Sequence, residues 1–363
     1  MSTRTRELKT HPTWQPYIDA RWGLPNYWYP AVFSDELSDG RFMGVQLLGE
    51  RILLARANGK AYAVADQCAH KGARFSGRPD CHKPGTITCF YHGFTYDLGS
   101  GKLVDILTSP EEPLIGKIGI RTYAVQEAQG LVFVFVGDAA PGPLEHDVPP
   151  GFLRDSLATA GIRREVKSNW RVACENGDDP SHLYTHRASP YMVGEGINIP
   201  VRTAGRDWSE KVRVITDRQP YGITDQFDRN VEVIEGGARA SGPSISIWMP
   251  GSLTVTPWPR PGMTNFEWYV PIDDRRHIYF QVLAREGDGS PQARERLRAE
   301  VVAKWDKALL RGFNDDDIFV RENVQDFYDD DSGYHQEHLI RADAVTTRWR
   351  ALVSQRNRGI KPR

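Results

Sequence analysis

The 363-residue sequence predicts an α+β protein with two domains. Between residues 28 and 136, short runs of strand-forming residues are separated by turn signals, a pattern typical of an antiparallel all-β domain. A segment with four prolines at 139–151 separates this region from a longer one that mixes strand-like and helical patterns. We therefore expect a small all-β domain at 28–150 and a larger domain, a helix-flanked antiparallel sheet, at 151–363. Residues 1–27 would form an N-terminal arm.

Composition narrows the class of protein. The hydrophobic content of 40% and the charged content of 26% are those of an ordinary globular protein. A formal net charge of −1 gives no reason to expect nucleic acid or an acidic membrane surface as partner. No apolar run approaches membrane-spanning length, and we expect no secretory signal. Four cysteines are too few for a disulfide scaffold, so we expect a reducing, cytoplasmic location with cysteines used as metal ligands.

In the first domain, turn signals separate runs that can pair as hairpins. The strongest is Asn58-Gly59, a dipeptide that favours the tight turns of two-residue hairpins. The predicted hairpins are 51–56 with 61–66, 86–97 with 102–106, and 118–125 with 131–136. Several short antiparallel strands of this kind predict a small all-β domain.

The second domain shows both strand-like and helical patterns. Strands are expected at 211–216, 230–234, 244–249, 253–256, 265–272 and 277–284. A helix over 292–311 would place one apolar face inward, made by Leu297, Val301, Trp305 and Leu309. A further helix after Gly312 would carry the stripe Phe313, Asp317, Val320, Val324 and Phe327. These patterns predict a sheet flanked by helices.

The first domain contains a C-x-H…C-x-x-H pair, Cys68-Ala-His70 and Cys89-Phe-Tyr-His92. Two thiolates and two imidazoles suit either a tetrahedral zinc or a Rieske [2Fe-2S] cluster, in which two histidines replace two cysteines on one iron. Because a structural zinc usually staples a domain too small to fold alone, and this domain already has several strands, we favour the cluster. Glycines near the ligand loops would also let the backbone approach the inorganic sulfides.

A second ligand-like group lies at Asp179-Pro180…His182…His186. Asp is a preferred N-cap and Pro suits the first helical position, so we expect a helix to begin here. Histidines four residues apart would then share one face and could bind one metal, with a carboxylate completing a facial triad for Fe(II). Taken alone, the pattern slightly favours the simpler explanation of two surface histidines on a capped helix.

The third ligand must be a carboxylate of the second domain. The candidates are Asp178, Asp315, Asp316, Asp317, Glu322 and the acidic run 329–331. Asp317 is the one carboxylate in the apolar stripe predicted after Gly312, and a buried carboxylate needs a partner such as a metal ion. Asp315 and Asp316 are explained by capping and by the helix dipole. The predicted triad is His182, His186 and Asp317.

Taken together, the two motifs resemble those of the terminal oxygenase components of Rieske non-haem iron oxygenases. The resemblance implies a [2Fe-2S] cluster on Cys68, His70, Cys89 and His92, and a mononuclear Fe(II) on the triad. It implies that Asp179 links His92 of a neighbouring chain to its own His182, and hence a homotrimer. It also implies reduction by a ferredoxin and an NAD(P)H-dependent ferredoxin reductase.

Within that family, members that oxidise carbazole share further stretches with this chain, at 26–30, 105–108, 167–171, 246–251, 266–272 and 312–318. The resemblance implies dioxygenation of an aromatic heterocycle. It assigns Gly177, Ile245, Leu253, Val255, Trp258, Asn265 and Phe313 to the substrate pocket, although alternation alone would place most of these in a sheet core. Trp258 is larger and Asn265 shorter than is typical there. The alternatives are a Rieske monooxygenase acting on another heterocycle, such as a quinolinone, or on a steroid, and a zinc-stapled binding protein.

Overall fold

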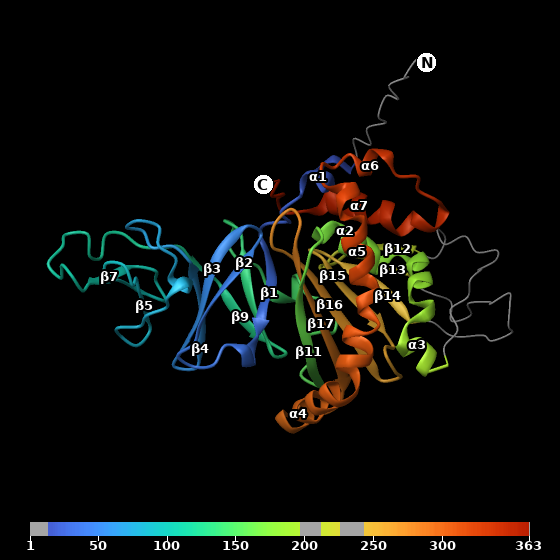
Figure 1. The fold of residues 1–363 in the computed structure, drawn as a ribbon, viewed down its shortest axis with the longest axis horizontal. Coiled ribbons are helices and arrows are strands. Elements are labelled where there is room, and N and C mark those ends of the chain that lie inside the picture. The colour runs from blue at the N-terminus through green and yellow to red at the C-terminus, as the bar shows by residue number, and fades with distance from the viewer. Residues whose placement is uncertain (1–13, 197–211, 226–242, 363) are drawn as a thin grey trace, which may run out of the picture. The chain divides into compact units, whose positions relative to one another are not determined.

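The computed structural model describes residues 14–196, 212–225 and 243–362 (Figure 1), and the strand expected at 230–234 lies outside them. The chain forms two compact units. The small unit is Pro25–Leu144, and the large unit combines Met1–Leu24 with Glu145–Arg363. The small unit is built from antiparallel sheets and the large unit from one sheet with helices, so the predicted α+β class is confirmed. In the part of the chain that the structure describes, no helix has the length and apolar character needed to cross a membrane.

The small unit contains three antiparallel sheets, with strand orders β2-β3-β4-β8, β1-β10-β9 and β5-β6-β7. The strands are β1 (Tyr27–Phe33), β2 (Phe42–Leu47), β3 (Glu50–Ala57), β4 (Lys60–Ala65), β5 (Thr86–Thr88), β6 (Phe94–Asp97), β7 (Leu103–Ile106), β8 (Thr122–Tyr123), β9 (Val125–Ala128) and β10 (Leu131–Val136). Asn58 and Gly59 join β3 to β4 with φ of 52° and 74°, the conformation expected from that dipeptide.

One hairpin of the small unit pairs differently from the prediction. The turn at Gln129 and Gly130 joins β10 to β9, which begins only at Val125. The residues before it instead form β8, which pairs with β4 of another sheet. The run 118–125 is therefore divided between two sheets, a division that its strand-like residues do not reveal.

The large unit is organised around a seven-stranded antiparallel sheet of order β11-β17-β16-β15-β14-β13-β12. Its strands are β11 (Leu157–Val166), β12 (Val212–Ile215), β13 (Gly222–Asp225), β14 (Ser244–Trp248), β15 (Ser252–Thr256), β16 (Met263–Pro271) and β17 (His277–Glu286). The sequence did not predict β11 or β13. In β11 the central Gly161 lacks a side chain because a Cβ there would lie 2.0 Å from the backbone oxygen of Gln281 in β17, and this glycine interrupts the strand pattern.

Helices pack on this sheet: α2 lies over β14–β16, and α5 lies beside α2 (Figure 1). The helical segments are α1 (Gln15–Asp19), α2 (Trp170–Asp178), η5 (Pro180–Ala188), α3 (Pro190–Gly194), α4 (Pro291–Glu300), η7 (Val301–Arg311), α5 (Asn314–Tyr328), α6 (Gly333–Gln336) and α7 (Ala344–Arg356), with short 3-10 turns η2 (Ser34–Glu36), η3 (Phe75–Gly77), η4 (Leu144–His146) and η8 (Arg341–Asp343). The helix expected at 292–311 is observed as α4 continued by the π-helix η7, and its predicted apolar face is buried.

The apolar stripe predicted for α5 is wrong. The buried side chains of this helix are polar, namely Asn314, Asp317, Arg321 and Gln325. Val320 and Val324 are half-buried, and Phe327 is 45% exposed. Asp317 is therefore buried, as predicted, but among polar side chains rather than as the lone carboxylate of an apolar face.

Two candidate metal centres

The small unit brings the two Cys/His pairs together on two loops of the same local conformation. Cys68 N donates to Ala73 O and Cys89 N donates to Phe94 O, at 2.9 and 2.8 Å. In each loop a glycine, Gly72 or Gly93, donates its N–H back to the cysteine carbonyl at 2.9 Å, with φ of 73° or 71°. Only a residue without Cβ adopts this left-handed conformation at low cost, which explains the glycine in the same place in each loop.

The four donors of these loops divide into an inner and an outer pair. The thiols of Cys68 and Cys89 are buried, and Tyr96 Oη lies 3.3 Å from Cys68 Sγ. The imidazole of His70 is exposed and that of His92 is half-buried, and their Nδ1 atoms lie 3.1 Å apart. That separation suits two ligands of one iron, so a buried thiolate pair could hold one iron and the more exposed imidazole pair the other.

This arrangement does not suit a single zinc ion. Four ligands of a tetrahedral zinc lie about 3.3–3.8 Å from one another, given metal–ligand distances of about 2.0–2.3 Å. Among the described residues, the group of three or more donors within 4.8 Å of one another is His182, His186 and Asp317, and it contains none of the four loop donors. The donors on the two loops are spread too widely for one ion, whereas a [2Fe-2S] cluster spans such a spread.

The second centre is formed by η5 and α5 of the large unit. Asp179 caps η5, accepting from Ser181 N at 2.6 Å, so the predicted helix start is present, although the helix is 3-10 rather than α. Asp317 Oδ1 lies 3.5 Å from His182 Nε2 and 3.4 Å from His186 Nε2. Ligands about 2.1 Å from one metal lie roughly 3.0–3.4 Å apart at octahedral to tetrahedral angles, so the three atoms fit one ion.

Burial and charge at this centre also favour a cation. His186 Nε2 and Asp317 Oδ1 are buried without a hydrogen-bond partner, a state that a bound metal would relieve. Burial alone would raise the pKa of Asp317, but His186 and Arg321 hold it well below its usual value. The protein also orients both imidazole rings through their Nδ1 atoms, which face away from the metal position. His186 Nδ1 lies 3.3 Å from Asp316 Oδ2, and His182 Nδ1 contacts the carbonyl of Asp179.

The other candidate carboxylates have other partners. Asp315 pairs with Arg164, and Glu322 accepts from Lys167 N. In the acidic run, Asp329 pairs with Arg275, and Asp331 pairs with Arg171. Only Asp317 among the candidate carboxylates belongs to the three-residue donor group.

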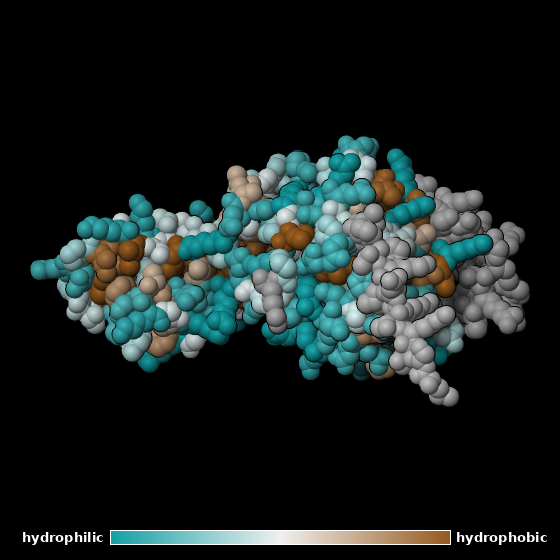
Figure 2. Space-filling model, turned by 90° about the horizontal axis from the view of Figure 1, so that it is seen from above, coloured by the Kyte–Doolittle hydropathy of each residue, from teal (hydrophilic) through white to brown (hydrophobic). Residues whose placement is uncertain are grey.

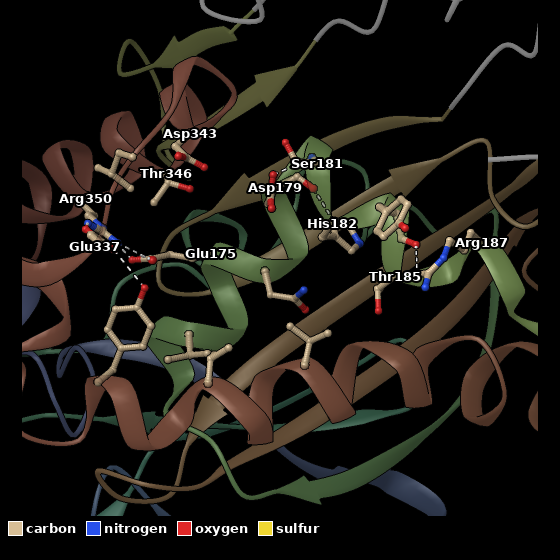
Figure 3. A pocket seen from close by; sticks show the side chains of 17 residues that line it. Glu175, Asp179, Ser181, His182, Thr185, Arg187, Glu337, Asp343, Thr346 and Arg350 are labelled. Carbon is tan, nitrogen blue, oxygen red and sulfur yellow. Dashed lines mark hydrogen bonds and ion pairs between the residues drawn. The ribbon is translucent and has the colours of Figure 1, made fainter. Parts of the chain in front are cut away.

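The carboxylate of Asp179 also faces a cavity of about 420 Å³ in the large unit (Figure 3). Ser181, His182 and Glu175 contribute to the wall of this cavity, as do Val320 and Val324 of α5. Burial raises the pKa of Asp179, and His182 opposes that effect. Asp179 is thus an acidic group in the cavity wall, next to the His182 imidazole.

The residues predicted to bind substrate lie around the sheet and the triad. Ile245, Leu253, Val255 and Asn265 occupy adjacent strands, where Val255 pairs with both Ile245 and Asn265. Phe313 stacks on His186, with ring centroids 3.8 Å apart, and Trp258 lies 5.2 Å from Phe313. Gly177 lies against the sheet, since a Cβ there would be 2.1 Å from Tyr269 Oη and 3.4 Å from Leu253 Cδ2.

The sequence prediction missed two buried charged residues, Glu267 and Arg321. Arg321 Nε donates to Asn176 Oδ1 at 2.6 Å, and its guanidinium lies over the rings of Tyr269 and Tyr279. Glu267 accepts from Tyr269 Oη at 2.7 Å. The sequence did contain a signal for Arg321 as a neighbour of Asp317, because Arg321 follows Asp317 by four residues, the spacing of neighbours on one helix face.

An all-β unit with paired Cys/His loops and a second unit with a two-histidine, one-carboxylate group together define the Rieske non-haem iron oxygenases. Comparison with known proteins supports this class. Residues 27–124 match the Rieske [2Fe-2S] domain model, and residues 135–361 match a family described as homotrimeric ring hydroxylase.

Similar proteins extend over nearly the whole chain. The terminal oxygenase component of carbazole 1,9a-dioxygenase from Sphingomonas sp is 44% identical, over 96% of each chain. The solved terminal oxygenase of carbazole 1,9a-dioxygenase from Novosphingobium sp. KA1 is 42% identical and has a TM-score of 0.90, over 97% of this chain and 98% of that one. A reduced complex between oxygenase and ferredoxin in carbazole 1,9a-dioxygenase is 40% identical, over 99% of this chain and 97% of that one, and has a TM-score of 0.89.

The chain therefore belongs to the homotrimeric ring hydroxylase family, with an N-terminal Rieske domain. It is an oxidoreductase of the Rieske ring-hydroxylating type, and its cofactors are a Rieske [2Fe-2S] cluster and a mononuclear non-haem iron. The resemblance predicted from the two motifs is confirmed.

Proposed function

We propose that this chain is the terminal oxygenase component of a multicomponent dioxygenase that adds both atoms of O2 to carbazole-like heterocycles, by angular attack at the ring-fusion carbon next to nitrogen. The observation that carries the proposal is the presence of both donor groups in one chain that is 44% identical to such a component along almost its whole length. A ferredoxin and an NAD(P)H-dependent reductase would supply electrons. Use of Cys68 and Cys89 as cluster ligands fits a reducing, cytoplasmic location.

The proposed ligands follow from the geometry. Cys68, Cys89, His70 and His92 would hold the cluster, and His182, His186 and Asp317 would hold the iron. When bound, the cluster supplies single electrons and the iron supplies the redox chemistry that activates O2. Phe313, stacked on His186, fixes that imidazole and presents an aromatic wall to the substrate. Apolar side chains such as Leu253 exclude water from the reacting ring.

Asp179 is proposed to link the two centres between subunits of a homotrimer. Its carboxylate faces a cavity beside the His182 imidazole (Figure 3), and His92 of a neighbouring chain would enter that cavity. On the small unit, His92 directly follows Phe90 and Tyr91, which are 45% and 58% exposed. Hydrophobic side chains also reach the surface of the small unit in Figure 2, as a docking region for a protein partner would require.

Replacing Asp179 by asparagine is expected to slow electron transfer between the two centres by about 10- to 100-fold, the usual effect of losing an outer hydrogen-bond partner of a metal ligand. Asn caps helices as well as Asp does, so the fold should be unchanged. Stopped-flow measurement of cluster reoxidation in the reduced protein with substrate and O2 gives the rate. If Asp179→Asn reoxidises at the wild-type rate while Asp179→Ala does not, Asp179 acts only as a helix cap.

Oxidation of carbazole under ¹⁸O2 tests the reaction itself. Purified protein with ferredoxin and reductase should yield an aminobiphenyl diol in which both added oxygens carry the label, as measured by mass spectrometry. A singly labelled phenol would instead indicate monooxygenation. No turnover of carbazole by protein with an intact Rieske spectrum would reject the substrate assignment and leave the enzyme class in place.

A further inference from the structure

The cavity beside Asp179 carries more negative than positive charge. Its ionisable wall residues, apart from His182, are the carboxylates Glu175, Asp179, Glu337 and Asp343 and the guanidiniums Arg187 and Arg350 (Figure 3). Arg350 pairs with both glutamates, and Arg187 donates to the carbonyl of Tyr184. In the part of the chain that the structure describes, these contacts leave Asp179 and Asp343 without a lysine or arginine partner.

The two aspartates lie close enough to influence each other. Burial has the largest effect on Asp179 and raises its pKa, and the negative charge of Asp343 raises it further. Each carboxylate accepts one backbone hydrogen bond, Asp179 from Ser181 N at 2.6 Å and Asp343 from Ile340 N at 2.5 Å. These bonds do not offset the repulsion between two negative groups, so the cavity favours a cation that enters from outside.

An unpaired donor in the same wall also indicates an occupant. Asn176 is 9% exposed, and its Oδ1 accepts from Arg321 Nε at 2.6 Å. The amide cannot turn over, because its NH2 group would then face the guanidinium. Asn176 Nδ2 has no acceptor among the described residues, and Asn176 belongs to the cavity wall whereas Arg321 does not. The NH2 group is therefore directed toward the cavity, where an occupant with an acceptor would relieve a costly unpaired donor.

The rim of the cavity has apolar side chains that reach the surface. Tyr184 and Leu339 belong to the wall and are 49% and 38% exposed, and Ile340, which follows Leu339, is 67% exposed. Exposed apolar side chains that surround a polar cavity are typical of a surface that binds a protein. The occupant should therefore be a protein segment that carries a cation next to apolar side chains.

The tip of the small unit has this composition. Lys71 directly follows His70 and is exposed. Its charge adds to partial desolvation and to the charge of His70 in lowering the pKa of His92, so Lys71 lies near that imidazole. Phe90 and Tyr91 are exposed, and the Tyr91 ring packs on His92 with centroids 3.7 Å apart. A cation, two apolar side chains and the backbone carbonyls of the loops are thus presented together.

We propose that Lys71 of a second copy of this chain forms an ion pair with Asp343 in this cavity, and that the pair positions the second copy's His92 beside Asp179. The inference rests on the proposed function, because it takes the small unit of a neighbouring subunit as the occupant, in a family of homotrimers. Asp343 is the partner of Lys71 because Asp179 is the acceptor for His92. Lys71 and Asp343 are positioning residues, since neither would hold a metal.

A double-mutant cycle in the full-length trimer tests the ion pair. Lys71→Met keeps the apolar stem of the side chain, and Asp343→Asn keeps an oxygen that can accept from Ile340 N. Each single variant should slow cluster reoxidation, measured by stopped flow with substrate and O2, by about 10-fold, the effect of a close charge pair at an interface. The double variant should be no slower than either single one, and Lys71→Arg should keep the wild-type rate.

Arg74→Met is the matched control, because it removes an exposed cation three residues from Lys71 and should keep the wild-type rate. Analytical ultracentrifugation confirms that each variant is compared as a trimer. The proposal is overturned if the effects of Lys71→Met and Asp343→Asn multiply in the double variant, or if Lys71→Met behaves as Arg74→Met does. It is also overturned if Lys71→Met slows only the reduction of the cluster by ferredoxin, which would assign Lys71 to ferredoxin binding. Failure of the proposed function is separate, because it shows as absent oxygenation of carbazole by the wild-type protein.

Discussion

Replacement of Asp317 by alanine is expected to abolish oxygenation and to leave the Rieske absorption spectrum unchanged. Asp317 Oδ1 lies within 3.5 Å of both histidine Nε2 atoms, so its loss removes one of three ligands and leaves two imidazoles on η5. Loss of an outer partner typically costs about 10- to 100-fold, so loss of a ligand should cost more, roughly 1000-fold or beyond. Product formation, iron content and the visible spectrum are measured on the same preparation.

Asp315→Ala is the matched control, since it removes a carboxylate from the same turn of α5. Asp315 is largely exposed and pairs with Arg164, a surface ion pair expected to contribute about 0–1 kcal/mol. Asp315→Ala should therefore keep both iron and activity. The triad assignment fails if Asp317→Ala protein retains stoichiometric iron outside the cluster and forms product at the wild-type rate.

The fold was predictable where local chemistry determines it. Asn58 and Gly59 produce the expected hairpin between β3 and β4 because their backbone conformations match a tight turn. Strand β11 was missed because Gly161 and the following arginines obscure its pattern, and because its pairing partner β17 lies more than a hundred residues away. Such pairing depends on close packing of the two backbones at Gly161, a feature that no local window contains.

The candidate site shows the same division between local and distant information. The spacing of His182 and His186 is a local signal, and the structure places both beside Asp317. Asp317 was selected from an apolar stripe that does not exist, since its buried neighbour on the helix is Arg321. Glu267 could not be recognised, because its environment is formed by a strand and by α5, which are distant in the sequence.

Replacement of Arg350 by methionine is expected to lower the free energy of unfolding of the large unit by about 3–5 kcal/mol, the cost of leaving buried charges without a partner. Arg350 on α7 is fully buried and donates to both carboxylate oxygens of Glu175 on α2, at 2.9 and 2.7 Å. It also contacts both oxygens of Glu337, one at 3.0 Å. Its guanidinium lies over the rings of Trp14 and Tyr334, so four segments meet at this side chain.

Calorimetry or chemical unfolding measures the loss, which should lower the melting temperature by roughly 6–20 °C. Arg356→Met is the control on the same helix, because Arg356 is exposed and its contact with the Tyr221 ring should contribute about 1 kcal/mol or less. A triple variant that also carries Glu175→Gln and Glu337→Gln should recover much of the stability, since it removes the unpaired charges along with their partner. If Arg350→Met costs no more than Arg356→Met, the buried cluster does not hold α7 against α2, and packing of apolar side chains such as Trp349 and Val353 alone joins these helices.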